Sequence, residues 1–219
     1  MKPDDADEPA WAAGRERPPA WRSGEGKVSF DNPWIGVTEH DAVAPTGRPA
    51  YYGVVRFKNV AVGVLPLHED GTVTLVGQQR FPLRNFSWEI PEGGAPFDEP
   101  PLEAARRELR EETGLEAAEF REILRMELSN SITDERGVCY LATGFSHGEV
   151  EPDETEALDV ARVPFRALLD AVVTGQVRDS LTVAAVLRAY HMAREGELPG
   201  ELARAMLEER AAVEVEGAN

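Results

Sequence analysis

The chain has 219 residues, enough for one substantial domain with a buried core and additional terminal segments. Hydrophobic residues make up 42% of it, as in folded proteins, and its formal net charge of −17 argues against nucleic acid as a partner, because an acidic surface repels a phosphate backbone. The sequence has no apolar stretch near the about 20 residues of a membrane span and no apolar signal-peptide core at its start, so we expect a cytoplasmic protein that does not contact a membrane.

The first 49 residues divide into two predicted parts. Residues 1–27 are rich in proline, glycine and charge, and they predict a flexible arm with isolated tryptophans. Residues 28–49 predict a strand and hairpin region, because Trp34–Val43 alternates weakly and the turn sequence Pro45-Thr46-Gly47 follows it.

Residues 50–195 predict the main domain, and residues 196–219 predict a polar helical tail. Strands are expected where apolar residues alternate between turn signals, over Tyr51–Phe57, Val60–Leu67, Thr72–Val76, Ser87–Ile90, Phe120–Leu128, Val138–Phe145 and Ala157–Val163. Helices are expected over about Pro100–Thr113, Phe165–Val173, Leu181–Arg194 and Glu201–Ala212. Strands and helices mixed within one span predict a layered α/β or α+β domain.

The single cysteine, Cys139, lies in an apolar run and cannot form an internal disulfide. We interpret it as a small core residue on a strand rather than a nucleophile, because free cysteine is among the most buried residue types. The four histidines are scattered without ligand spacing, and no role is assigned to them.

The helix over about Pro100–Thr113 has clear start and stop signals. Asp98 or Glu99 can cap its first turn, and proline suits the first helical position because its missing N–H group is not needed there. Gly114 can adopt the left-handed conformation that ends a helix. The apolar residues recur at helical spacing and predict a buried stripe along one side: Leu102, Ala105 and Leu109.

Three carboxylates lie directly beside this apolar stripe. Glu108, Glu111 and Glu112 are spaced i, i+3 and i+4, so they share one face of the helix. Carboxylates crowded at a core edge raise one another's pKa, and a hard divalent cation such as Mg²⁺ relieves their repulsion. Arg107 can hold them in place by pairing with Glu103 and Glu111 at four-residue spacing. The alternative is an ordinary solvated acidic face, but the position beside the core favours a metal site.

The segment from Gly93 to Leu115 resembles the Nudix signature at every defined position. In that pattern Gly93 is followed after five residues by Glu99 and then, after seven more, by the run Arg107–Leu115, which reads Arg-Glu-Leu-Arg-Glu-Glu-Thr-Gly-Leu. So many defined positions make the match far more specific than a lone glycine motif. The resemblance, weaker over the rest of Trp34–Arg194, implies an α/β fold: a Nudix-type α/β/α sandwich with a mixed sheet, here with an N-terminal strand extension.

The resemblance also implies a metal-dependent hydrolase that splits a pyrophosphate bond. Glu108 and Glu112 would be the principal metal ligands, the backbone carbonyl of Glu92 another, and Glu111 a supporting catalytic group or the ligand of a further ion. Arg107 would assist catalysis by holding the carboxylates. Mg²⁺ is the expected cofactor, with Mn²⁺ as an alternative, and the ions would act as Lewis acids on the diphosphate and help to generate the attacking hydroxide.

A second motif narrows the resemblance to the ADP-ribose and nucleotide-sugar pyrophosphatases. It consists of Val76-Gly77-Gln78-Gln79-Arg80 followed by Trp88-Glu89-Ile90-Pro91. By this resemblance Arg80 binds substrate phosphate, and an arginine fork is what an otherwise acidic protein needs to hold a diphosphate. The alternative for Arg80 is a surface residue at the end of a strand.

A second acidic segment, residues 149–159, contains no basic residue. In the resembling subgroup a glutamate from the corresponding loop orients or deprotonates the attacking water, which would make Glu156 the catalytic base. Glu154 is the alternative, and a solvated loop explains most of the other acidic residues.

The substrate is less sharply indicated than the reaction. In the segment Ser129–Arg136, Asn130 and Ser131 replace the proline and glycine of a Ser-Pro-Gly loop in ADP-ribose pyrophosphatases, so GDP-mannose, other nucleotide sugars, dinucleoside polyphosphates and oxidised nucleotides stay open beside ADP-ribose. A non-catalytic ADP-ribose sensor is a further alternative. Such sensors usually have a degraded signature or an added basic domain, and this sequence displays neither.

The resemblance also implies a homodimer in which N-terminal strands reach the partner and help to form the base-binding pocket. The predicted hairpin Trp34–Val43 fits this role, and Trp34 would stack on the base. Ordinary interface packing is the alternative for this tryptophan.

Overall fold

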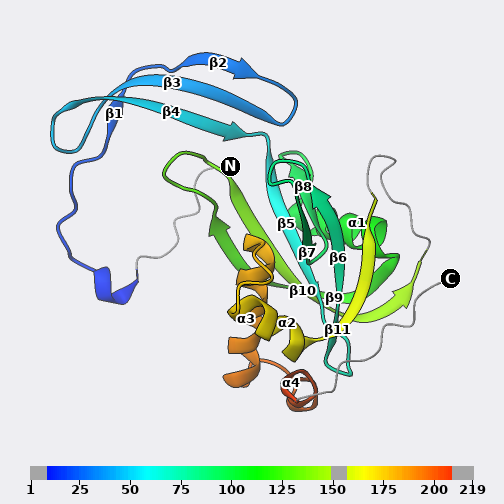
Figure 1. Cartoon of the computed structure of the whole chain (residues 1–219). Helices are drawn as coiled ribbons and strands as arrows, with labels where there is room; N and C mark the ends of the chain where they lie inside the picture. The colour runs from blue at the N-terminus through cyan, green and yellow to red at the C-terminus, as the bar shows by residue number, and fades with distance from the viewer. Residues whose placement is uncertain (1–8, 149–156, 209–219) are drawn as a thin grey trace. The chain divides into compact units, whose positions relative to one another are not determined.

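The computed structural model describes residues 9–148 and 157–208, and the chain divides into two compact units, Met1–Arg56 and Phe57–Asn219 (Figure 1). The described elements of the first unit are a 3-10 helix (Ala10–Ala12), β1 (Arg22–Ser23), β2 (Lys27–Asp31), β3 (Ile35–Val43) and β4 (Pro49–Phe57). Those of the second are β5 (Asn59–Pro66), β6 (Thr72–Arg80), β7 (Asn85–Glu89), β8 (Glu92–Pro96), α1 (Pro101–Thr113), β9 (Leu115–Glu127), β10 (Arg136–His147), β11 (Asp159–Pro164), α2 (Phe165–Val173), α3 (Ser180–Arg194) and α4 (Gly200–Leu207).

The first unit is a sheet in which β3 pairs with β1, β2 and β4. β1 lies within the predicted arm, and its Arg22 and Ser23 pair with Val43 and Ala42 of β3. The turn predicted between β3 and β4 is present, where the N–H of Gly47, at φ 82°, donates to the carbonyl of Ala44 at 2.8 Å. Four large apolar side chains of this unit's sheet and turns remain exposed: Val28, Phe30, Trp34 and Tyr51.

The second unit contains a four-stranded sheet in the order β8-β5-β10-β9 and a three-stranded sheet in the order β11-β6-β7. β5 and β10 run parallel, whereas every other pair in these two sheets is antiparallel, so the unit has the predicted mixed character. Helix α1 lies on one side of the strands, and α2 and α3 lie on the other (Figure 1).

The core of this unit consists of two apolar clusters on opposite faces of β5. Val62 and Val64 pack with Leu109 of α1, while Leu65 packs with Val186 of α3. Alternate residues of a strand point to opposite faces, so one buried strand can supply both clusters. The α/β/α sandwich predicted by resemblance is therefore confirmed.

Element boundaries differ from the sequence prediction mainly in the strands. β6 continues to Arg80 because its last residues pair with β7, and β9 begins at Leu115 because Leu115 pairs with His147 of β10. Pairing with a neighbouring strand extends a strand beyond the residues whose alternation reveals it. None of the helices in residues 9–148 and 157–208 is long and apolar enough to cross a membrane.

Candidate active site

Helix α1 follows the predicted pattern at its end and has the predicted proline at its first position, but its N-cap differs. Gly114 is left-handed, at φ 68°, and its N–H donates to the carbonyl of Arg110 at 2.8 Å. Pro100 occupies the N-cap position and offers no side-chain hydrogen bond, so the predicted cap by Asp98 or Glu99 was wrong. Since Glu99 lies one residue before the cap, its carboxylate is available for another contact.

Arg107 gathers the acidic side chains of this segment. Its Nη2 donates to Glu99 at 3.0 Å and to the carbonyl of Gly94 at 3.1 Å, and its Nη1 donates to Glu108 at 2.7 Å and to Glu111 at 3.2 Å. The hydrogen bond to Glu99, followed by the charge of Glu108, raises the pKa of Arg107 although burial opposes the shift. The guanidinium therefore fixes three carboxylates relative to the backbone of β8.

The pairing predicted between Arg107 and Glu111 is present, whereas the partner predicted as Glu103 is instead Glu99. Glu103 lies 3.9 Å from Arg106 on the exposed side of the helix. An arginine can reach along the chain to a residue before the helix, a contact that four-residue spacing does not predict.

Glu108 and Glu112 face the first residues of β8. Glu112 is only 4% exposed, and its Oε2 accepts a 3.0 Å hydrogen bond from the backbone N–H of Glu92. A Cβ atom placed on Gly93 would lie 2.2 Å from Oε1 of Glu108, so this carboxylate occupies the space that the glycine leaves. Carboxylate and carbonyl oxygens are the donors that a hard divalent ion prefers, and Glu108 and Glu112 offer donors of this kind beside the backbone of β8.

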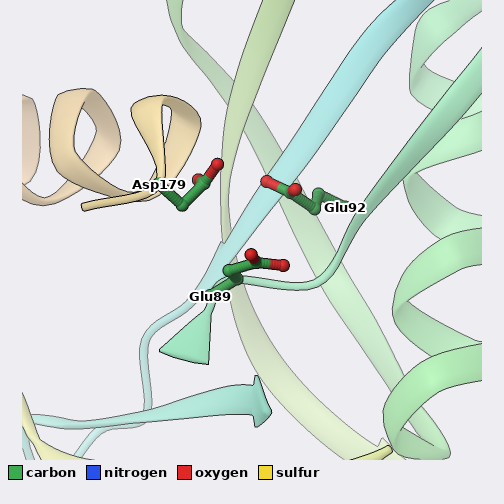
Figure 2. A group of neighbouring side chains, drawn as sticks. All are labelled: Glu89, Glu92 and Asp179. Atoms are coloured by element: carbon green, nitrogen blue, oxygen red, sulfur yellow. The ribbon is translucent and has the colours of Figure 1, made fainter. Parts of the chain in front are cut away.

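A second group of carboxylates lies at the other side of Glu92, where Glu89, Glu92 and Asp179 each offer an oxygen within 4.8 Å of the others (Figure 2). They come from the end of β7, the start of β8 and the N-cap of α3. Burial, followed by the charges of Asp179 and Glu89, raises the pKa of Glu92 well above its ordinary value. Its Oε2 is buried and has no hydrogen-bond partner within residues 9–148 and 157–208.

Arg80 is bound by two members of this second group. Its Nε lies 3.0 Å from both oxygens of Glu89, and its Nη2 donates to Glu92 at 2.6 Å. Burial lowers the pKa of Arg80, but the hydrogen bond to Glu89 and the charge of Glu92 outweigh it and raise the pKa. Arg80 is thus held by carboxylates through one edge of its guanidinium, while the side chain stays about one-third exposed.

The two groups meet at the short connection between β7 and β8, residues 90 and 91, which we call the β7–β8 bridge. The N–H of Ile90 donates to the hydroxyl of Thr182 at 3.0 Å, and the carbonyl of Pro91 accepts from the N–H of Val64 at 2.8 Å. Asp179 caps α3 by accepting from the N–H of Thr182 at 2.7 Å. These contacts place the N-terminus of α3 beside the site.

Sequence reasoning assigned no role to Glu89, Asp179 or Thr182. Glu89 stands inside the motif that was used for Arg80, and Asp179 directly precedes an apolar helical pattern, as an N-cap residue does. Nothing local indicates that these residues meet, because they belong to three separate elements.

The remaining predicted residues belong to the first unit, to the core, or to the part of the chain outside the described residues. Trp34, in the first unit, is 68% exposed, and its backbone N–H donates to the side-chain oxygen of Asn32 at 2.9 Å. Glu156 and its alternative Glu154 lie outside the described residues. Cys139 is fully buried, and burial raises the pKa of its thiol to about 12, so it is a core residue as predicted.

Comparisons with known proteins concern the family and the fold of this chain. The family model described as the NUDIX domain matches residues 57–184. An ADP-ribose pyrophosphatase of Mycobacterium tuberculosis is 32% identical over 133 residues, which are 59% of this chain and 64% of that protein. An ADP-ribose pyrophosphatase of Bacillus subtilis is 32% identical over 159 residues, which are 72% of this chain and 85% of that protein.

A solved structure of an ADP compounds hydrolase superposes with a TM-score of 0.74 at 18% identity and covers 84% of this chain and all of that chain. At this identity the likeness concerns the fold. The family model covers more than half of the chain and includes the complete segment from Gly93 to Leu115. The chain therefore belongs to the Nudix family.

Proposed function

We propose that this protein hydrolyses the pyrophosphate bond of a nucleoside diphosphate sugar, ADP-ribose or a related nucleotide sugar, to a nucleoside monophosphate and a sugar phosphate. The observation that carries the proposal is the meeting of Glu108 and Glu112 with the start of β8, next to the exposed edge of Arg80. The names of the two relatives support the substrate class.

The oxygen donors proposed for the metal are the carboxylates of Glu108 and Glu112 and the carbonyl of Glu92, with Glu111 as support. We propose Mg²⁺, with Mn²⁺ as an alternative. When bound, such an ion polarises the diphosphate and lowers the pKa of a coordinated water. The rest of the chemistry depends on how the side chains are held.

Arg107 keeps Glu108 and Glu111 in place through two hydrogen bonds, so they retain their positions when substrate enters. Arg80 offers its remaining N–H groups to the diphosphate, and its pairing with Glu89 fixes the plane of the guanidinium. Water attacks one phosphorus atom, the bridging P–O bond breaks, and the phosphate of the other product leaves. The proton of the water passes to Glu156, or to Glu154 as the alternative base.

Assembly into a homodimer belongs to the same proposal. The exposed apolar side chains of the first unit, including Phe30 and Trp34, offer the kind of surface that a dimer buries. We expect Trp34 to contact either the base of the substrate or the partner. Sedimentation velocity on the wild type and on Trp34→Ala would detect loss of the dimer, and a rise in KM without dissociation would favour base binding.

Cell fractionation tests the proposed cytoplasmic location.

Turnover on a panel of ADP-ribose, GDP-mannose, other nucleotide sugars and dinucleoside polyphosphates, with Mg²⁺ and with a chelator, tests the central proposal. We expect hydrolysis of a nucleotide sugar that requires the metal. Activity that survives chelation would contradict the mechanism, and preference for a dinucleoside polyphosphate would change the substrate class. Tight ADP-ribose binding without turnover on any compound would favour the sensor.

Substitutions separate the two candidate bases. We expect Glu156→Gln to lower kcat by about a hundredfold, as the loss of a general base does, while Glu154→Gln leaves it unchanged. The reverse result would assign the role to Glu154. Equal, full activity of both variants would remove this loop from the mechanism.

A further inference from the structure

Helix α3 carries no part of the Nudix signature, yet its first turn contacts the bridge between β7 and β8. Thr182 is fully buried, and its hydroxyl oxygen accepts the N–H of Ile90 at 3.0 Å across 92 positions of sequence. Ile90 is itself fully buried, so no solvent can replace this acceptor. The contact fixes a backbone amide that neither sheet pairs.

Thr182 is in turn held in one place. Its own N–H donates to the carboxylate of Asp179 at 2.7 Å, and the neighbouring Leu181 packs so closely that a Cβ on Gly137 would lie 2.8 Å from it. A β-branched side chain in a helix has few rotamers. The position of the hydroxyl is therefore determined by the cap and the core rather than by the contact with Ile90.

The residues on both sides of Ile90 carry the groups of the proposed site. Glu89, directly before it, holds Arg80, and Glu92, two residues later, donates its N–H to Glu112 at 3.0 Å. Pro91, between them, is tied to Val64 at 2.8 Å. A shift of the Ile90 amide would move the Glu92 backbone and the Glu89 carboxylate together.

We infer that Thr182 is a positioning residue of this enzyme, whose hydroxyl holds the β7–β8 bridge so that the backbone of Glu92 stays beside the Glu112 carboxylate, where the two would hold a divalent ion. This inference rests on the proposed function, since it concerns the same site. It assigns to the start of α3 a role in metal affinity that the signature on α1 does not include.

Thr182→Val tests the inference because it keeps the shape of the side chain and removes the acceptor. We expect Mn²⁺ binding to the substrate-free protein, measured by electron paramagnetic resonance, to weaken about tenfold, as it does when an outer-shell partner of a metal site is lost. The Mg²⁺ concentration for half-maximal turnover should rise in parallel. Thr182→Ser keeps the hydroxyl and should bind Mn²⁺ within about twofold of the wild type.

Thr74→Val is the matched control, because Thr74 is also a buried threonine whose hydroxyl contacts a side chain, that of His68, at 2.8 Å. It should lose stability without losing Mn²⁺ affinity. Wild-type Mn²⁺ affinity in Thr182→Val, or an equal loss in Thr74→Val, would overturn the inference. Should Thr182→Val not fold, Thr182→Cys replaces it, because a thiol is a weak acceptor; equal affinity of the cysteine and serine variants would then overturn the inference.

The Mn²⁺ measurement needs no turnover, so it separates this inference from the proposed function. If the wild type binds Mn²⁺ and Thr182→Val does not, while no nucleotide sugar is hydrolysed, the positioning role stands and the proposed substrate class fails.

Discussion

Two arginines each gather carboxylates at β8, and the two groups are assembled in different ways. Arg107 binds Glu99, Glu108 and Glu111, all within α1 or the residues just before it. Arg80 binds Glu89 and Glu92, and Asp179 joins them from α3. Most of the first group lies within one helix and the residues just before it, whereas the second exists only after β7, β8 and α3 have come together.

The two groups also differ in their exposure to solvent. The side chains of Arg107, Glu99 and Glu111 are between 27% and 33% exposed, so water screens their charges, and that of Glu108 is 14% exposed. Those of Glu89 and Glu92 are 3% and 12% exposed, and the pKa of Glu92 is raised accordingly. The second group therefore adds negative charge where charge is costly. Substitutions in each group should therefore change different kinetic parameters.

The largest effect is expected for Glu112→Gln, which removes the charge of a proposed metal ligand and keeps the size of the side chain. Turnover with a nucleotide sugar should fall by about a hundredfold or more, because a metal contributes several kcal/mol to the transition state. Steady-state kinetics across Mg²⁺ concentrations measures this. Glu103→Gln, on the exposed side of the same helix, is the control, and near wild-type turnover of Glu112→Gln at saturating Mg²⁺ would refute the assignment.

Arg107→Lys should lower kcat by about tenfold, because an ammonium group cannot donate to three carboxylates and a carbonyl at fixed angles. The expected KM for substrate is close to that of the wild type. Arg106→Lys, on the exposed face of the same helix, should retain full activity. If Arg106→Lys lost as much kcat as Arg107→Lys, the effect would come from replacing any arginine of this helix and not from the contacts of Arg107.

Glu89→Gln should raise KM by about tenfold with a smaller change in kcat, because Arg80 loses the ionised partner that orients it toward the diphosphate. Arg80→Lys should have the same direction of effect. Initial-rate kinetics on both variants compares this group with that of Arg107. If the Glu89 and Arg107 variants changed the same kinetic parameter to the same extent, the two carboxylate groups would act as one unit and would not have separate roles.

The smallest effect concerns pH and a residue outside both groups. Burial, followed by the charge of Arg162, lowers the pKa of His68 from 6.5 to about 4. Between these values the unfolded chain binds more protons than the folded protein, so the contribution of His68 to stability is complete above pH 6.5 and is lost as the pH falls toward 4.

His68→Gln removes this part of the pH dependence. Thermal denaturation at about pH 7.5 and about pH 5 should show a smaller loss of stability in the variant than in the wild type. Equal losses in both proteins would place the proton-linked step at a residue other than His68.

Much of the fold, and the acidic face of α1 within the site, could be predicted from the sequence because their signals are local. The positions of Glu108, Glu111 and Glu112 beside Leu109 follow from the period of a helix, and the buried Glu112 agrees with the predicted core edge. The left-handed Gly114 and the buried Cys139 were predicted for similar reasons. Each of these conclusions needs the conformation of one segment alone.

The predictions that were wrong concern contacts across segment ends. A cap at Asp98 or Glu99 is a sound expectation from residue type, but the backbone places Pro100 at the N-cap, and Glu99 binds Arg107 instead. The early start of β9 and the late end of β6 depend on partner strands in the same way.

By itself, the sequence determined the acidic face of α1 beside its apolar stripe, the left-handed glycine that ends this helix, and the family to which the chain belongs. The tertiary structure alone decided that Arg80 meets Glu89 and Glu92, and that Asp179 and Thr182 stand beside them. The physical reason is that helix periodicity relates residues a few positions apart, whereas only the packing of β7, β8 and α3 brings together residues that are about 90 positions apart in the chain.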